Sequence, residues 1–280
     1  MAQTEFTSIL YRRDEAGIVT VAINRPEIKN ALTLRVLIDL YRAADAFEKD
    51  PAAMALIVTG APPPGGADPS AEAFSSGGYF NPAELESLSA EERGAIDLTD
   101  IALKKLCLKL WGLDKPVIAA INGLAIGGGF TIPAAGADLI YASEHAWVRF
   151  PFVRLGIAPE LASSYLFPRL LGMQRTKELF FFGEKIPAAE LAGLGLVNKV
   201  LPHARLLPYA REMALRLIPP LGAPLAVRWT KQILHQPLVE AVSRALDREN
   251  EVLNKAFGTS DFFEAVAARL ERREPAFKGV

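Results

Sequence analysis

The sequence has little that could hold a metal ion or form a disulfide framework. Its 280 residues include one cysteine, Cys107, and three histidines, His145, His203 and His235, which are far apart in the chain. A single thiol excludes an intrachain disulfide and any metal site with several thiolate ligands. We therefore expect no metal site, and either a reducing compartment or a protein that is indifferent to redox conditions.

An excess of charge of one sign is also missing. The 31 Lys and Arg residues nearly balance the 32 Asp and Glu residues, which leaves a formal net charge of −1. This balance gives no electrostatic reason to expect a nucleic acid as a partner.

The sequence shows no signal peptide and no convincing membrane span. Residues 1–7 contain Glu5 and no apolar core, so we predict a cytoplasmic protein. The longest uncharged run, at residues 117–137, contains Asn122, Pro133 and five glycines. A helix facing lipid would leave these breaks unsatisfied, whereas a strand, a glycine-rich turn and a buried helix use all of them. We expect no membrane partner.

Several common catalytic motifs are absent. The sequence contains no G-x-x-x-x-G-K-[ST], no G-x-S-x-G and no H-E-x-x-H pattern, and its glycine-rich run is not G-x-G-x-x-G. Phosphate-loop nucleotidases, serine hydrolases with a nucleophile elbow, zinc proteases and dinucleotide-binding proteins are therefore disfavoured.

Half of the residues are hydrophobic, and they follow an alternation of strand and helix patterns. Such alternation favours an α/β fold with a mostly parallel sheet. We expect a hairpin, a helix capped by Thr33, a loop at residues 60–70 and a long amphipathic stretch at residues 90–113. The predicted strands are residues 9–13, 18–24, 55–59, 117–121 and 139–142, and a further helix runs through residues 132–135.

Beyond Pro202 the pattern is helical only. Helices are expected at residues 204–217, 223–235, 238–256 and 261–272. We therefore divide the chain into a core at residues 1–202 and a C-terminal helical region at residues 203–280.

Two glycine-rich segments could bind an anion through backbone N–H groups. The first is FSSGGYF at residues 74–80, which by itself is more typical of a flexible turn. The second is INGLAIGGG at residues 121–129, where a buried strand meets the start of a helix and free N–H groups coincide with the positive end of the helix dipole.

Glu160 is the third candidate. It follows Pro159 and has mainly apolar and aromatic neighbours for ten residues on either side. One interpretation is a helix start with an acid in its first turn. The other is a general base, because an apolar pocket raises the pKa of a carboxyl group towards neutrality.

Together these segments resemble the crotonase (enoyl-CoA hydratase/isomerase) superfamily over nearly the whole chain. The resemblance rests on four segments in order: Asn24-Arg25-Pro26 followed by Asn30-Ala31-Leu32, the loop at 74–78, the run at 121–129, and the segment at 183–197. It implies a crotonase-like spiral of ββα units with a C-terminal helical trimerisation region. A homotrimer or a hexamer, built as a dimer of trimers, is implied as well.

The resemblance also implies acyl-CoA thioester substrates, with no cofactor apart from the coenzyme A of the substrate. The N–H groups of Gly78 and Gly128 would then receive the thioester oxygen, and each such donor typically supplies ~3 kcal/mol. Coenzyme A and the acyl group would lie near a set of residues from three segments: Ile28, Lys29, Ala31, Ser75, Ser76, Gly77, Tyr79, Phe277 and Lys278.

The sequence departs from the hydratase pattern at the two glutamates that handle water, where it has Thr131 and Phe152. It is instead similar to peroxisomal-type Δ3,Δ2-enoyl-CoA isomerases, in which one glutamate, here Glu160, performs the whole reaction. Fatty acid metabolism, including β-oxidation, is the implied context. We expect an apolar wall that excludes water and holds the acyl chain, made of Phe130, Phe150, Phe152 and Leu155.

Two alternatives remain open. The chain could be a hydratase, a lyase, a hydrolase or another relative in which Glu84, Glu86 or Asp97 replaces the missing acids. It could also be a non-catalytic acyl-CoA-binding protein, because a fold alone does not prove catalysis.

Overall fold

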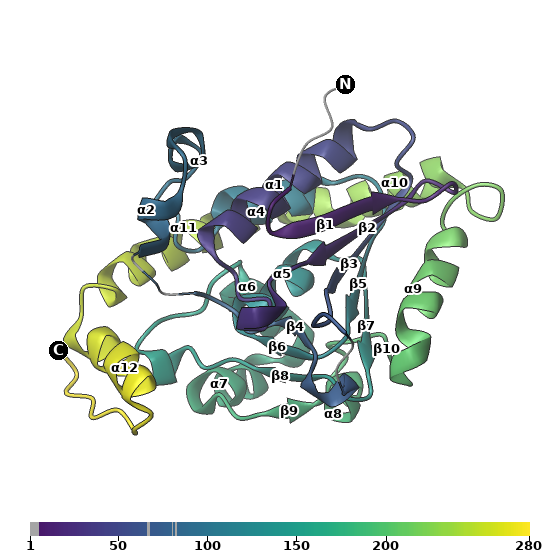
Figure 1. Ribbon diagram of the computed structural model, residues 1–280. Helices are drawn as coiled ribbons and strands as arrows, with labels where there is room; N and C mark the ends of the chain where they lie inside the picture. The colour runs from purple at the N-terminus through teal and green to yellow at the C-terminus, as the bar shows by residue number, and fades with distance from the viewer. Residues whose placement is uncertain (1–5, 66–67, 80, 82) are drawn as a thin grey trace.

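Two β-sheets form the centre of the molecule. The computed structural model describes residues 6–65, 68–79, 81 and 83–280 (Figure 1). The six-stranded sheet has the order β1 (Ile9–Arg13), β2 (Ile18–Ile23), β3 (Ala55–Gly60), β5 (Val117–Ile121), β7 (Leu139–Ser143) and β10 (Lys199–Leu201). The four-stranded sheet has the order β4 (Ala73–Ser75), β6 (Leu124–Ile126), β8 (Trp147–Arg149) and β9 (Ile186–Pro187).

From β3 to β8, successive strands alternate between the two sheets. Strands β3, β5 and β7 of the large sheet are each followed in the chain by a strand of the small sheet, β4, β6 and β8, and helices follow each pair. The large sheet is parallel apart from the β1–β2 hairpin. Asn122 fixes the turn between β5 and β6, since its side chain accepts from Gly60 N at 3.1 Å and donates to Glu72 Oε2 at 2.8 Å. The predicted α/β fold with ββα units is confirmed.

Helices cover both faces of the large sheet. One face packs against α1 (Leu34–Lys49), α4 (Lys104–Gly112) and α5 (Gly128–Gly136). Helix α1 begins as the sequence predicts, because Thr33 Oγ1 accepts a hydrogen bond from Val36 N at 3.2 Å. The other face packs against α9 (Leu206–Leu215), which buries Leu206, Ala210 and Ala214 at helical spacing.

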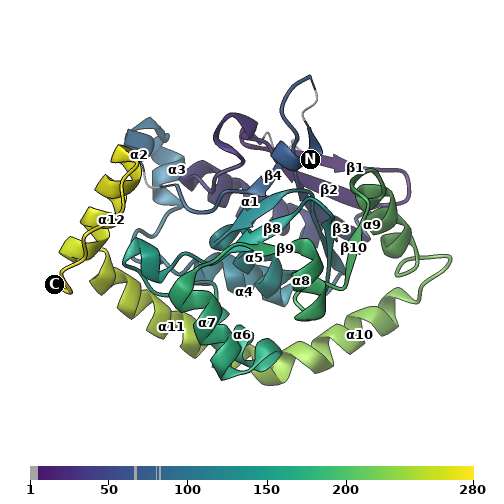
Figure 2. The same ribbon diagram turned by 90° about the horizontal axis from the view of Figure 1, so that it is seen from below.

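The remaining helices surround this core. Figure 2 shows α10 (Pro224–His235), α11 (Val239–Ala256) and α12 (Ser260–Glu271) following one another along the outer edge. Between β8 and β10 lie α6 (Ser163–Leu171), α7 (Met173–Phe182) and α8 (Ala188–Gly193). Short 3₁₀ helices occur at Pro26–Ile28, Pro69–Ala71, Val153–Leu155, His203–Arg205 and Gln236–Leu238. Among the described residues, no helix has the length and apolar character needed to cross a membrane.

The amphipathic stretch at residues 90–113 is not one continuous helix. Helices α2 (Ala83–Ser87) and α3 (Ala90–Gly94) precede a turn, and α4 begins only at Lys104. The Asp100 carboxylate accepts hydrogen bonds from Lys104 N at 2.7 Å and Lys105 N at 2.9 Å, so it caps α4. The short strands β6, β8, β9 and β10 were also not predicted. The division at residues 202/203 stays a prediction, and α9 packs directly on the large sheet.

Candidate active site

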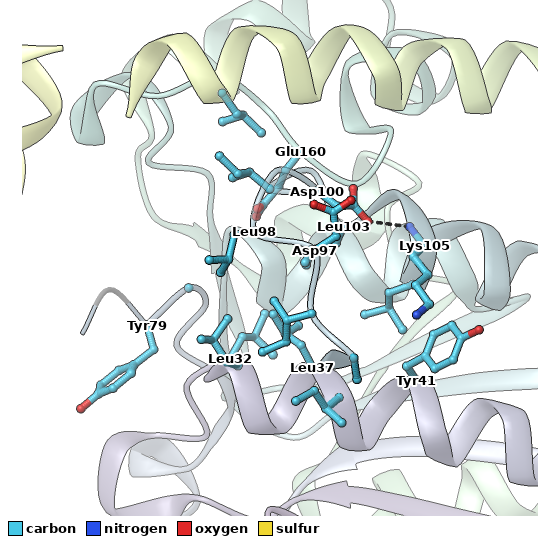
Figure 3. Close-up of a pocket in the computed structure, with 18 of the residues that line it drawn as sticks. Leu32, Leu37, Tyr41, Tyr79, Asp97, Leu98, Asp100, Leu103, Lys105 and Glu160 are labelled. Atoms are coloured by element: carbon cyan, nitrogen blue, oxygen red, sulfur yellow. Dashed lines mark hydrogen bonds between the residues drawn. The ribbon is translucent and has the colours of Figure 1, made fainter. Parts of the chain in front are cut away.

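A cavity of about 430 Å³ opens beside α1, the turn at residues 95–103 and the start of α4 (Figure 3). This volume lies within the usual range for small-molecule sites. Its polar lining includes Glu160, Asp97, Asp100, Lys105 and Tyr41. The apolar lining consists mainly of aliphatic side chains: Leu32, Leu34, Leu37, Ile38, Ile96, Leu98, Ile101, Leu103, Leu106, Ile157, Leu253 and Phe257.

The first predicted glycine loop forms one edge of this cavity. Ser76 N donates to Lys29 O at 2.9 Å, and Leu32 N donates to Gly77 O at 2.8 Å. Gly77 has φ +82°, and an ideal Cβ at this position would lie 2.3 Å from Ile126 O. Only glycine fits this turn, and it places Gly78 at the cavity in a parallel bridge with Leu32. Phe80, the last residue of the predicted loop, lies outside the described residues.

The second glycine run joins the same site. Helix α5 begins after Gly127, which has φ 50° and ψ −121°. An ideal Cβ on Gly128 would lie 2.8 Å from Leu32 Cδ1 and 3.1 Å from Glu160 Oε1, and one on Gly129 would lie 2.5 Å from Ser75 O. The two glycine turns therefore pack directly against each other, although about fifty residues separate them in the sequence, and the second turn also contacts Glu160.

Glu160 lies just before α6, not within it. The helix begins at Ser163, so the interpretation of Glu160 as a first-turn acid is wrong. Leu161 and Ala162 intervene with φ 54° and φ 56°, and Leu161 N donates to Ala102 O at 3.2 Å. This turn directs the Glu160 side chain towards the cavity (Figure 3).

The surroundings of Glu160 favour its neutral form. Burial, and then the neighbouring Glu249 carboxylate, raise the pKa of Glu160 to about 7, while a hydrogen bond from the Gly128 backbone N–H opposes this rise. At neutral pH this carboxyl group is therefore close to its midpoint, which suits a group that takes and returns a proton.

The segments expected to hold coenzyme A support the first glycine loop. Ile28 O accepts from Ser76 Oγ at 3.1 Å, and Ser75 Oγ accepts from Gly77 N at 3.2 Å. Ala31 is buried beside this loop, and Lys29 adopts a left-handed conformation.

Three further predicted binding residues lie at the edge of the cavity or away from it. Tyr79 lies at the cavity edge, with its side chain turned away from Leu37 in Figure 3. Phe277 and Lys278 do not line the cavity, since the chain end folds onto α12, where Lys278 N donates to Asp261 Oδ1 at 2.7 Å.

The expected aromatic wall does not line the cavity. Phe130, Phe150 and Phe152 are buried and pack on one another and on α7, with ring centroids of Phe130 and Phe150 5.8 Å apart and those of Phe152 and Phe180 5.1 Å apart. Leu155, in the 3₁₀ helix after Phe152, does not line it either. The three phenylalanines form part of the core, because an aromatic cluster gains most from complete burial.

Most of the residues that do line the cavity were not predicted as site residues. Leu34, Leu37, Ile38 and Tyr41 share one side of α1 and have the same helical spacing as the residues that pack on the sheet. Their spacing alone could not separate a cavity wall from a core face. Glu249 was also missed; it lies on α11 and accepts hydrogen bonds from Ala162 and Ser164.

Of the alternative acids, Asp97 lines the cavity, whereas Glu84 and Glu86 on α2 do not. Asp97 accepts hydrogen bonds from Thr99 N at 2.9 Å and Thr99 Oγ1 at 2.6 Å, and these lower its pKa. Among the described residues, no group of three or more His, Cys, Asp and Glu side chains is arranged to hold a metal ion.

Known proteins with similar sequences cover almost the whole chain. The sequence is 33% identical to a short-chain-enoyl-CoA hydratase of Clostridium acetobutylicum over 93% of this chain and 94% of that protein. It is 30% identical to a 2,3-dehydroadipyl-CoA hydratase of Escherichia coli over 94% of this chain and 95% of that protein.

Solved structures give the same relationship. An enoyl-CoA hydratase/isomerase from Pseudoalteromonas atlantica matches with a TM-score of 0.82 and 26% identity, covering 97% of this chain and 100% of that one. OdaA of Pseudomonas aeruginosa matches with a TM-score of 0.81 and 29% identity, covering 95% and 99%. The sequence model of the family described as enoyl-CoA hydratase/isomerase matches residues 13–280. The chain therefore belongs to the enoyl-CoA hydratase/isomerase family, the crotonase superfamily.

Proposed function

We propose that this protein is an enoyl-CoA isomerase that moves the double bond of a 3-enoyl-CoA to the 2-trans position. The observation that carries the proposal is the position of the Glu160 carboxylate, which faces an apolar cavity beside Gly128 and has its pKa raised to about 7. One carboxylate that exchanges its proton near neutral pH is sufficient for a 1,3-proton shift.

The proposed reaction uses two proton transfers. The Glu160 carboxylate removes a proton from C2 of the substrate, and the electrons of the C2–H bond move to form a dienolate with its negative charge on the thioester oxygen. The protonated Glu160 then delivers the same proton to C4, which leaves the double bond between C2 and C3. No other reactant enters or leaves.

The backbone N–H groups of Gly78 and Gly128 would stabilise the dienolate oxygen. The Gly128 backbone lies next to the Glu160 carboxylate, and its N–H favours the ionised form of Glu160. A thioester oxygen that takes over this donor would remove an interaction that favours ionised Glu160. Substrate binding would thereby make Glu160 a stronger base at the moment when a base is needed.

The positions that match the hydratase glutamates support an isomerase. Thr131 is buried, and its Oγ1 donates to Gly127 O at 3.3 Å, while Phe152 is buried among aromatic rings. Neither side chain can act as the acid or base that activates a water molecule. The apolar lining around Glu160 also disfavours a bound water next to the substrate.

A hydratase is the second candidate. The most similar proteins described above carry hydratase names, which favours this reaction. A hydratase needs a second group to handle water, and the other carboxylates on the cavity wall are Asp97 and Asp100. Both oxygens of Asp100 already accept from the first N–H groups of α4, so Asp97 would have to serve. Its low pKa and its bonds to Thr99 make it a poor general acid.

Purified protein incubated separately with 3-hexenoyl-CoA and with crotonyl-CoA distinguishes the two reactions. We expect absorbance of the conjugated thioester to appear with 3-hexenoyl-CoA, because isomerisation creates that chromophore, and to persist with crotonyl-CoA. Loss of the crotonyl-CoA absorbance without conversion of 3-hexenoyl-CoA would overturn the isomerase proposal in favour of a hydratase. If the absorbance changes with neither substrate, the result would support a non-catalytic acyl-CoA-binding protein.

A further inference from the structure

Glu249 is a buried carboxylate on α11 with an exposed fraction of 4%. Among the residues that the structure describes, no Lys, Arg or His lies within ion-pair distance of it, and it does not line the cavity. Its partners are hydrogen-bond donors: Ala162 N at 2.8 Å to Oε2, and both Ser164 N at 2.9 Å and Ser164 Oγ at 2.5 Å to Oε1. Burial of a carboxylate without a neighbouring cation costs desolvation free energy, which these three hydrogen bonds offset only in part.

These donors belong to the turn that follows Glu160 and to the first turn of α6. Leu161 and Ala162 both have the left-handed backbone that side-chain-bearing residues rarely adopt. Such a conformation persists only where the surrounding structure fixes it. Glu249 supplies this constraint, because its two oxygens accept from the residues on either side of Ser163. The direction of the Glu160 side chain therefore depends on a residue about ninety positions away.

The two carboxylates also interact through charge. Glu249 raises the pKa of Glu160, and burial raises the pKa of Glu249 itself to about 7 against its hydrogen bonds to Ser164 and Ala162. On α4, burial, Glu249 and Asp100 raise the pKa of the Cys107 thiol to about 12, so that thiol is neutral. Asp100 is held by Lys104 N, Lys105 N and the Asn250 side chain.

We propose that Glu249 is a positioning residue for the reaction at Glu160: its carboxylate fixes the turn at residues 161–164 and so holds the Glu160 carboxylate at the cavity beside Gly128. This inference rests on the proposed function. The negative charge of Glu249 also assists the reaction, because it raises the pKa of Glu160 and so makes Glu160 a stronger base.

The test compares Glu249→Gln with Glu251→Gln. Glu251 lies on the same helix and is exposed in an ion pair with Lys255, so it is a matched control. In Glu249→Gln we expect kcat to fall roughly 10- to 100-fold with a change in KM of about twofold or less, because a misplaced base costs rate more than binding. The acid limb of the pH profile of kcat/KM should move to lower pH, because the like charge is gone. A loss of rate through looser structure alone would leave this limb in place.

A second variant and a second readout keep the test decisive. Ser164→Ala removes one of three donors from the Glu249 carboxylate and should lower kcat about threefold to tenfold, within the range for the loss of one ordinary hydrogen bond. Infrared titration measures the protonation of Glu160 without a measurement of enzyme activity. The Glu160→Gln variant identifies the infrared band of the Glu160 carboxyl group. We expect that band to titrate at lower pH in Glu249→Gln than in the wild type.

The outcomes separate the two proposals. If wild-type protein is active and Glu249→Gln matches Glu251→Gln in kcat and pH profile, Glu249 has no positioning role. If wild-type protein does not isomerise 3-enoyl-CoA, the proposed function fails, and the infrared titration still decides whether Glu249 acts on Glu160. Should Glu249→Gln not fold, an unchanged kcat in Ser164→Ala would overturn the inference.

Discussion

At the scale of the single residue, Glu160 illustrates how catalysis and stability oppose each other. Burial raises its pKa from an ordinary value of 4.5 to about 7. The folded protein therefore binds this proton more tightly than the unfolded chain does, and the free energy of unfolding decreases as pH rises from about 4.5 to about 7. The proposed reaction needs ionised Glu160, whereas burial in the folded protein favours the protonated form.

Glu160→Gln should therefore stabilise the protein at pH 8. A neutral amide of nearly the same shape removes the cost of a buried charge, so we expect the free energy of unfolding at pH 8 to rise by on the order of 1–2 kcal/mol. At pH 4.5 the gain should largely vanish, because the wild-type carboxyl is then protonated. Urea unfolding at both pH values, with Glu251→Gln as the control, measures this difference. An equal change at the two pH values would contradict the assigned burial of the charge.

At the scale of the element, the glycine turns decide where the backbone N–H groups point. Gly77 has a positive φ and leaves no room for a Cβ beside Ile126 O. The loop between β4 and α2 is therefore tied to the end of β6 by a contact that only glycine permits. The position of Gly78 depends on this contact.

Gly77→Ala should destabilise the protein by about 2–4 kcal/mol, because a methyl group would meet Ile126 O at 2.3 Å in a backbone conformation that alanine avoids. The proposed isomerase activity should fall as well, since Gly78 would move. Gly112→Ala is the matched control: Gly112 lies within α4, and its Cβ would meet nothing within 4 Å. Thermal unfolding and turnover of both variants test this role, which would be wrong if Gly77→Ala behaved like Gly112→Ala.

Elements with a strong local pattern could be predicted from the sequence, and elements fixed by distant contacts could not. The continuous apolar run of β5 and the Thr33 cap of α1 are local signals, and both predictions are confirmed. The start of α6 was misplaced because Leu161 and Ala162 carry no signal for a left-handed backbone. Their conformation depends on Glu249, which is far away in the sequence. Strands of two or three residues, such as β9 and β6, are too short to show a period.

At the scale of the whole molecule, the cavity is assembled from segments that only the tertiary fold brings together. Helix α1, the turn at residues 95–103, Glu160 and the end of α11 all contribute to its wall. The resemblance of four ordered segments predicted the fold and named Glu160, Gly78 and Gly128, which the structure places around one site. The wall could not be predicted, because an aliphatic residue at helical spacing is equally compatible with a core and with a cavity.

The predicted trimer or hexamer belongs to this scale too and stays a prediction. Helix α10 leaves Leu225, Trp229, Ile233 and Leu234 exposed by 55%, 58%, 71% and 64%. Apolar side chains gathered in this way are typical of surfaces that another chain covers.

The central claim is that one carboxylate, Glu160, carries the proton in both directions. Turnover of 3-hexenoyl-CoA by Glu160→Gln, compared with wild type and with Glu251→Gln, tests it most directly. We predict that kcat falls by ~100-fold or more while KM stays within about twofold, because a positioned general base contributes that much to rate and little to binding. Turnover by Glu160→Gln at the wild-type rate would contradict the claim.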